Sequence, residues 1–267
     1  MRAARRRRIG LIGFGYIGRE MWRRIVAGAD ADLEIAFVHN RSPEALAAVP
    51  PAQRLADLAD FARHQPDLVV EMAHPSTTQQ WGERILQVAD YLPLSVTALA
   101  DDALRGRLQA QAQAAGTVLG VPHGALMGLD SLHEWRHAWE EVTIAFHKHP
   151  ANIDFSASGL PAGPYEHATT LYDGPVRGIA ARFPRNVNTM VTCALATIGL
   201  DRCRAVLVTD PALRCAIADV QARGRDGSLL HLRKEQPAQG VSGTEMIESQ
   251  WASLRRMAGT REPLAFV

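Results

Sequence analysis

The sequence has few cysteines, no excess of either charge and no long hydrophobic run, and each shortage excludes a class of protein. Its three cysteines, Cys193, Cys203 and Cys215, are odd in number and lack C-x-x-C spacing, which favours a reducing compartment over a disulfide framework. The formal net charge of +1 lacks the basic excess of a nucleic-acid binder. No apolar run reaches the roughly 18 residues that a membrane span needs. We therefore expect a cytoplasmic protein without nucleic-acid or membrane partners.

Two further motifs are missing from the chain, and its beginning is unusual. There is no Gly-x-Ser-x-Gly elbow and no P-loop, so acyl transfer and phosphoryl transfer have no support. Five of the first eight residues are arginine, but no apolar stretch of secretory type follows them. Because this basic run is short and adjoins an apolar strand, we expect a solvent-exposed tail.

Short apolar strands alternate with helical segments in the first half of the 267 residues. After a first strand around residues 9–12, further strands are expected at Leu33–Val38, Asp67–Met72, Leu92–Leu99 and Thr117–Val121. This alternation is typical of a parallel, doubly wound sheet. Three later strand candidates follow one another without helices: Arg204–Thr209, Cys215–Ala222 and Leu229–Arg233. The fold class that we predict is α/β: an N-terminal Rossmann doubly wound parallel sheet (residues 1–125) with a second, smaller α+β domain (126–240).

The sequence also predicts helices in both halves of the chain. Two short helices are expected around Pro50-Pro51, and longer ones at 77–89, 101–115, 129–140, 174–181 and 187–198. A final amphipathic helix, about Thr244–Met257, belongs to a C-terminal helix and tail (241–267) that could pack on either domain.

A glycine-rich turn directly follows the first apolar strand and precedes a helical segment. In Gly13-Phe14-Gly15-Tyr16-Ile17-Gly18, the first glycine permits the tight turn and the second lets the backbone approach a pyrophosphate. The third allows close helix–strand packing, and the helix N-terminus attracts phosphate. The expected cofactor-binding residues here are Gly13, Gly15, Tyr16, Ile17 and Gly18. The alternative is a glycine turn in some other α/β unit.

The end of the second strand bears on the choice of cofactor. An NAD-preferring unit usually has an acid about 20 residues after the glycines, where it binds the ribose 2′-hydroxyl. Here Asn40 takes that position and Arg41 follows it. Loss of the carboxylate removes repulsion against a 2′-phosphate, with which an arginine can pair. NAD or NADP could bind, and these two residues favour NADP; Arg41 could instead stack on adenine or point to solvent.

Several histidines are candidates for chemistry. His74 and His123 lie in loops after strands of the expected parallel sheet, where ligands bind. His133-Glu134-Trp135-Arg136-His137 is a literal H-E-x-x-H, which on a helix could bind zinc. No metzincin-type continuation supplies a third ligand, and the chain has ten histidines, so a chance match is the simpler explanation. We expect no metal, and the role of this motif stays open.

Taken together, these segments resemble the L-aspartate dehydrogenase family. The matching segments, in order, are IGLIGFGYIGRE, VVEMAHPS at Val69–Ser76, SVTALAD at Ser95–Asp101, VPHGALMGLDSL at Val121–Leu132, FPRNVN at Phe183–Asn188 and the Thr209-Asp210-Pro211 turn. The resemblance implies NAD(P)-dependent oxidation of L-aspartate to an imine, which hydrolyses to oxaloacetate and ammonia, or the reverse reaction. It also implies a homodimer, a substrate and dimerisation role for the second domain, and cofactor contacts at Ala125 and Asn188.

The chain departs from the family pattern in its second half. The family usually follows the Asp-Pro turn with Asn-x-His, whose histidine is the catalytic acid/base, whereas this chain has Ala216 and Ala218 in those places. Alanine cannot transfer a proton, and a general acid/base contributes about 10²–10⁴-fold in rate. The family's Asn-Pro-Lys-Thr-Ser segment is replaced by a sequence near Gln239–Gly243. The cofactor half is therefore retained while the substrate half is changed.

Three functions remain open from the sequence. The first is an NAD(P)-dependent dehydrogenase of an amino acid such as L-aspartate, binding the amino acid or its keto or imino acid. For this function His123 would replace the acid/base, and Lys148, Arg185 and His74 would bind substrate, unless the two cations face solvent. Asp219 neighbours Ala218 but would point the opposite way on a strand. The others are an oxidoreductase of a different imine or carbonyl compound, and a non-catalytic dinucleotide-binding protein.

Overall fold

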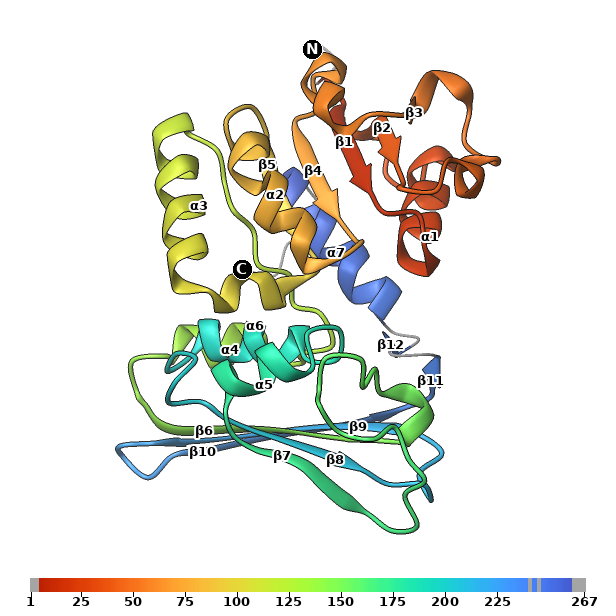
Figure 1. Ribbon diagram of the computed structural model, residues 1–267. Helices are drawn as coiled ribbons and strands as arrows, with labels where there is room; N and C mark the ends of the chain where they lie inside the picture. The colour runs from red at the N-terminus through yellow and green to blue at the C-terminus, as the bar shows by residue number, and fades with distance from the viewer. Residues whose placement is uncertain (1–4, 240–241, 244–245, 261–267) are drawn as a thin grey trace. The chain divides into compact units, whose positions relative to one another are not determined.

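The computed structural model describes residues 5–239, 242–243 and 246–260, which form two compact units (Figure 1). The first unit comprises Met1–Pro122 and Gln250–Val267, and the second comprises His123–Ser249. Among the residues described, no helix is long and apolar enough to cross a membrane.

The first unit contains a five-stranded parallel sheet with the order β3-β2-β1-β4-β5. Its strands are β1 (Arg7–Ile12), β2 (Leu33–His39), β3 (Arg54–Leu55), β4 (Leu68–Glu71) and β5 (Asp90–Pro93). Its helices are α1 (Tyr16–Val26), α2 (Pro75–Leu86), α3 (Asp102–Ala115) and, in part, α7 (Met246–Ala258). Residues 9–12 and all of β4 are buried, as expected for strands covered on both faces. The predicted Rossmann sheet is confirmed.

Two of the predicted strands of this unit are wrong in their extent. β5 ends at Pro93, and residues 96–99 of the expected strand lie in a 3-10 helix (Val96–Ala100). The Ser95 N–H donates to the Glu71 side chain and not to a strand carbonyl. In the expected strand 117–121, only Leu119 bridges to Tyr91, and Val118 and Val121 are exposed. The two helices expected between residues 42 and 64 are 3-10 turns: Pro43–Leu46, Pro51–Gln53 and Leu58–His64.

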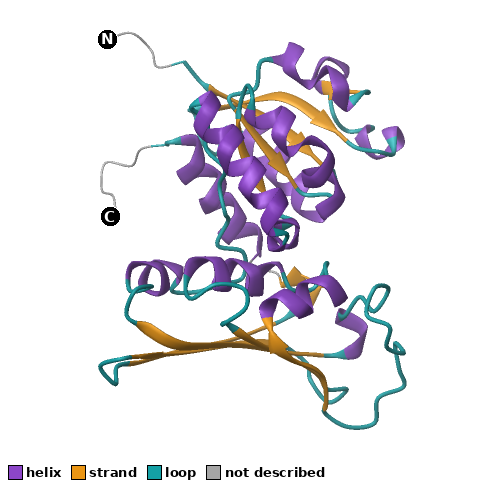
Figure 2. Cartoon of the chain, turned by 60° about the vertical axis from the view of Figure 1, so that its left-hand side comes forward, coloured by secondary structure: helices purple, strands orange, loops and turns teal. Residues whose placement is uncertain are grey.

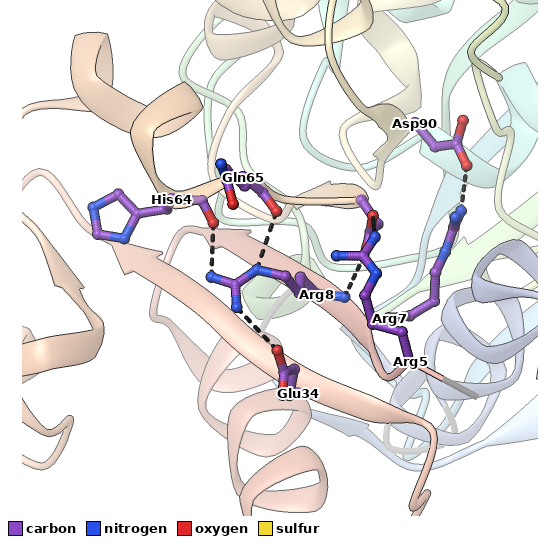
Figure 3. A network of polar contacts seen from close by, with 8 residues as sticks. Arg5, Arg7, Arg8, Glu34, His64, Gln65 and Asp90 are labelled. Carbon is purple, nitrogen blue, oxygen red and sulfur yellow. Dashed lines mark hydrogen bonds and ion pairs between the residues drawn. The ribbon is translucent and has the colours of Figure 1, made fainter. Parts of the chain in front are cut away.

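Arginines at the start of β1 hold the amino ends of the strands together (Figure 3). Arg7 pairs with Asp90 at 2.5 Å, so it connects β1 with β5. Arg8 pairs with Glu34 at 3.0 Å and also donates to the backbone carbonyls of His64 and Gln65. The expectation of a solvent-exposed tail is therefore wrong for Arg7 and Arg8, which belong to the sheet.

Helix α7 packs on the first unit from the far end of the chain. Arg255 Nε lies 2.7 Å from Asp30 Oδ2, and Asp30 is only 8% exposed. The guanidinium of Arg24 lies 5.8 Å from the centroid of the Trp251 ring. The helix covers most of the segment predicted for it, and Thr244 lies outside the described residues.

The second unit contains a mixed five-stranded sheet with the order β10-β9-β6-β8-β7. Its strands are β6 (Trp139–Lys148), β7 (Thr169–Pro175), β8 (Arg204–Thr209), β9 (Ala216–Gly224) and β10 (Leu229–Gln236), and a short pair is formed by β11 (Ala238–Gln239) and β12 (Ser242–Gly243). Only the β6–β8 pair in this five-stranded sheet is parallel. Helices α4 (Leu129–Glu134), α5 (Val176–Arg182) and α6 (Asn188–Ala196) cover one face of the sheet (Figure 1, Figure 2). The predicted second α+β domain is confirmed, although α4 ends six residues before the predicted end at Glu140.

We expect Asp30→Asn to destabilise the first unit by about 2 kcal/mol, because it removes the buried negative charge that pairs with Arg255. Urea unfolding followed by circular dichroism measures this change. Asp60→Asn is the matched control: its partner Arg63 is 82% exposed, so a change below about 0.5 kcal/mol is expected. Equal effects of the two substitutions would show that the Asp30–Arg255 pair does not anchor α7.

Candidate functional site

The glycine turn of the first unit leaves an open space in front of the N-terminus of α1. Gly13 has a φ of +98°, and a Cβ there would lie 2.7 Å from the Met72 carbonyl oxygen. A Cβ on Gly18 would lie 2.2 Å from the Gly13 carbonyl oxygen, whereas a Cβ on Gly15 would meet nothing within 4 Å. Packing therefore requires the first and third glycines. The second borders empty space at the N-terminus of α1, where the first N–H groups of an α-helix have no carbonyl partner within the helix, and this arrangement fits a dinucleotide pyrophosphate.

Asn40 braces this turn from the end of β2. Its Oδ1 accepts a hydrogen bond from the Phe14 N–H at 3.1 Å, and its Nδ2 donates to the Ser42 carbonyl at 3.0 Å. Arg41, which follows it, is exposed. The residues at this strand end present amide and guanidinium groups, and they add no carboxylate that would repel a phosphate.

Glu71, at the carboxyl end of β4, is fully buried and joins two loops. Its Oε1 accepts hydrogen bonds from the N–H groups of Ala73 and His74, at 2.7 and 2.8 Å, and from the Ser95 hydroxyl at 2.9 Å. Its Oε2 accepts the Ser95 N–H at 3.2 Å. Burial raises the pKa of Glu71, against the opposing effect of these donors. The loops after β4 and β5 are thus held together at the sheet edge where ligands bind.

His74 lies in the first of these loops, as predicted, and its side chain caps a helix. The ring Nδ1 accepts the Ser76 N–H at 3.2 Å at the start of α2. Sequence reasoning missed Glu71, although an acid within the apolar run VVEM was a usable signal. A carboxylate in a strand buried on both faces requires hydrogen-bond donors, and the loop backbone supplies them.

The second unit has an open pocket that brings together six of the residues named from the sequence. These are Ala125, Lys148, Arg185, Asn188, Ala216 and Ala218. The remaining lining residues are Phe146, Asn152, Asn186, Thr189, Ile217, Gln236 and Met246. The loop around Ala125, the end of β6, the start of α6 and the centre of β9 therefore converge on one pocket.

Two cations give this pocket its charge. Lys148 is only 8% exposed, and its Nζ lies 5.3 Å from the centroid of the Phe146 ring. Arg185 is more exposed and pairs with Asp154 at 2.8 Å. Hydrogen bonds from the Ser156 hydroxyl and N–H hold the pKa of Asp154 below its ordinary value, and Arg185 adds to this effect. Cations beside several asparagine side chains suit a small anion such as a carboxylate.

The loop containing Ala125 is fixed to the wall of this pocket. The Ala125 N–H donates to Thr189 Oγ1 at 3.1 Å, and Lys234 Nζ donates to the Ala125 carbonyl at 2.7 Å. Lys234 lies on β10 directly opposite Ala218 of β9. Sequence reasoning missed Lys234 and Gln236, because the expected strand ended at Arg233, whereas β10 continues to Gln236.

The other candidates are not among the residues that line this pocket. His123 is half-buried two residues before Ala125 and is not among the lining residues. Asp219 points away from Ala218, as predicted, and its Oδ2 lies 2.8 Å from His231 Nε2. Of the H-E-x-x-H motif, His133 and Glu134 lie in α4, which ends at Glu134, so His137 lies outside this helix. In the described part of the chain, no three His, Cys, Asp or Glu side chains cluster as metal ligands.

Comparison with known proteins gives the same division of the chain. The family profile described as "Aspartate dehydrogenase, C-terminal" matches residues 132–248, and the one described as "Homoserine dehydrogenase, NAD binding domain" matches residues 13–122. An aspartate dehydrogenase domain-containing protein from Xenopus tropicalis is 36% identical, over 97% of each chain. L-aspartate dehydrogenase 1 from Bordetella pertussis is 34% identical, over 95% of this chain and 93% of its own.

The chain belongs to the aspartate dehydrogenase family. The resemblance inferred from the sequence is thereby confirmed, and so is its assignment to NAD-binding oxidoreductases. The solved aspartate dehydrogenase from Thermotoga maritima shares the fold, with a TM-score of 0.74 at 23% identity over 98% of this chain and 99% of that one.

Within this family member, Gly15→Ala and Gly18→Ala should fail in different ways. The alanine methyl group at position 15 would enter the space in which we expect the pyrophosphate. We therefore expect an unchanged melting temperature and at least ~10-fold weaker NADPH binding. The Gly18 methyl group would strike the Gly13 carbonyl, which should cost about 1–3 kcal/mol of stability. Thermal unfolding and NADPH fluorescence titration separate the two effects. Wild-type affinity in Gly15→Ala would place the pyrophosphate elsewhere.

Ser95→Ala tests how much the Ser95 hydroxyl stabilises the buried carboxylate of Glu71. Removal of the hydroxyl donor should destabilise the protein by about 1.5–3 kcal/mol while Glu71 is ionised. The loss should shrink as the pH falls through the raised pKa of Glu71, because a protonated carboxyl group gains less from the donor. Unfolding at several pH values measures this. Ser228→Ala, which removes an exposed hydroxyl bond to Asp226, should change stability by less than about 0.5 kcal/mol at every pH.

Proposed function

We propose that this protein is an NAD(P)-dependent amino-acid dehydrogenase that acts on L-aspartate or a closely related acidic amino acid. The observation that carries the proposal is the convergence of Lys148 and Arg185 on one pocket with asparagine side chains. A dicarboxylate needs two cationic partners, and these two lie on different segments of the same pocket wall. Oxidation removes a hydride from Cα and a proton from the amino group, and water then hydrolyses the imine to the keto acid and ammonia.

We propose cofactor contacts in each unit, taken separately. When bound, NAD(P) accepts or supplies the hydride. In the first unit, Gly13, Gly15, Tyr16, Ile17 and Gly18 would hold the pyrophosphate, while Asn40 and Arg41 would face the ribose. The exposed guanidinium of Arg41 and the absence of an acid at position 40 support NADP over NAD. Ala125 and Asn188 would contact the nicotinamide end, and their place in the pocket wall supports this role.

The acid/base of the reaction cannot be residue 218, where alanine replaces the family histidine. We propose His123 for this role, because it lies in the loop that holds Ala125 and because imidazole is the side chain that most often serves as a general acid or base. His74, exposed at the carboxyl edge of the first sheet, is proposed as a substrate contact. For assembly we propose a homodimer, for which the helix-free face of the second sheet is available.

Ala218 also supports a second function. A pocket without the family acid/base suits an oxidoreductase of a different imine or carbonyl compound, or a protein that binds the dinucleotide without turnover. The two cations remain in either case, so an anionic ligand is common to all three functions.

We expect slow but measurable oxidation of NADPH by the wild-type protein with oxaloacetate and ammonium, followed by the absorbance of NADPH. Ala218→His should raise kcat by ~10²-fold or more, because it supplies a general acid in the pocket. His123→Ala should abolish the wild-type rate and have less effect in the Ala218→His background. If neither wild type nor Ala218→His turns over oxaloacetate, aspartate is the wrong substrate. A panel of keto acids and amines then separates another substrate from binding without turnover.

A further inference from the structure

The floor of the second-unit pocket is a trough between two strands. On β9, Ala218 is opposite Phe146 of β6 on one side and Lys234 of β10 on the other, and Ala216 is opposite Gln236. Residues two apart on a strand share a face, and both alanines line the pocket. Because alanine side chains end at Cβ, the central strand is low while its neighbours bear long side chains.

Lys148 and Gln236 form opposite walls of this trough. Lys148 follows His147, which pairs with Ile217, so the register brings it beside Ala216. Gln236 pairs with Ala216 from the other side. Two strand spacings separate β6 from β10, about 10 Å. The row Lys148–Ala216–Gln236 therefore has a cation at one end, an amide at the other and room for a small molecule between them.

The amide wall contains an acceptor that no described residue satisfies. Gln236 Oε1 is buried and has no hydrogen-bond partner. Leaving a buried acceptor without a hydrogen bond costs about 1–3 kcal/mol, so such an atom in a pocket points to a ligand that donates a hydrogen bond to it. Among the residues that the structure describes, four buried side-chain atoms lack a hydrogen-bond partner, and of these only Gln236 Oε1 belongs to a residue that lines the pocket.

We propose that Gln236 binds the amino group of the substrate, and so determines that this site takes an amine. An amide oxygen accepts hydrogen bonds and repels a carboxylate, so it selects the nitrogen end of an amino acid. Lys148, across the trough, selects a carboxylate. The pair fixes which way round an acidic amino acid lies, with its amino group over β10 and a carboxylate over β6. This inference rests on the proposed function.

The experiment compares two ligands that differ only in the amino group. L-aspartate and succinate are titrated calorimetrically into wild type and Gln236→Leu, each saturated with NADP⁺. Wild type should bind L-aspartate at least ~10-fold more tightly than succinate, since a hydrogen bond to a charged group corresponds to that factor. Gln236→Leu should bind succinate as wild type does and lose the preference for aspartate. In turnover, its KM for ammonium should rise by a similar factor while its KM for NADPH stays constant.

Two further variants keep the test decisive. Gln236→Glu retains an acceptor and should keep the preference for L-aspartate, even if Gln236→Leu fails to fold. Gln221 is an exposed glutamine of β9 on the opposite face of the sheet, so Gln221→Leu should change the affinity for neither ligand. An aspartate-to-succinate ratio that is the same in wild type and Gln236→Leu would overturn the role of Gln236 and leave the proposed function standing. If wild type binds neither acid, the proposed function is wrong, and the role of Gln236 is rejected with it.

Discussion

The close approach of two backbone segments at Gly13 and Gly18 sets the geometry of the first unit. The carbonyl of Gly13 occupies the place where a side chain on Gly18 would begin, so α1 can start directly after β1 only with glycine there. The Met72 carbonyl closes the other side of Gly13, and Glu71 orders the backbone just beyond it. One tight turn thus fixes the first helix and the loop after β4 relative to each other, and it leaves Gly15 beside empty space.

The pocket of the second unit results from the sizes of side chains on neighbouring strands. β9 has small residues at positions where the neighbouring strands β6 and β10 have long ones, so the hollow is a property of the sheet surface itself. The resemblance to the family implies asparagine and histidine at positions 216 and 218, where this chain has alanines that line the pocket without a polar side chain. Neighbouring strands still offer polar groups there, since Lys234 and Gln236 lie directly opposite the two alanines.

The sequence predicted the parts of the molecule that depend on local patterns. The glycine turn, the alternation of strands and helices and the change to consecutive strands after residue 200 all follow from spacing and composition. The failures lie where tertiary contacts decide. β5 ends at Pro93, although the apolar pattern predicted a strand up to Leu99. β6 begins at Trp139, within the segment 129–140 that was predicted to be a helix. The site shows the same division: Lys148 and Arg185 were found as cations, whereas Gln236 is recognisable only from the register of β10 against β9.

The brace formed by Asn40 links cofactor choice to loop shape. The carbonyl end of its amide holds the Phe14 N–H, and the amino end holds the Ser42 carbonyl. An aspartate at this position could keep the first bond but would set a carboxylate against the Ser42 oxygen. In the proposed cofactor site, an acid at position 40 would therefore need a compensating change in residues 40–42. Selectivity at that site would depend on the conformation of the whole loop as well as on the charge of one side chain.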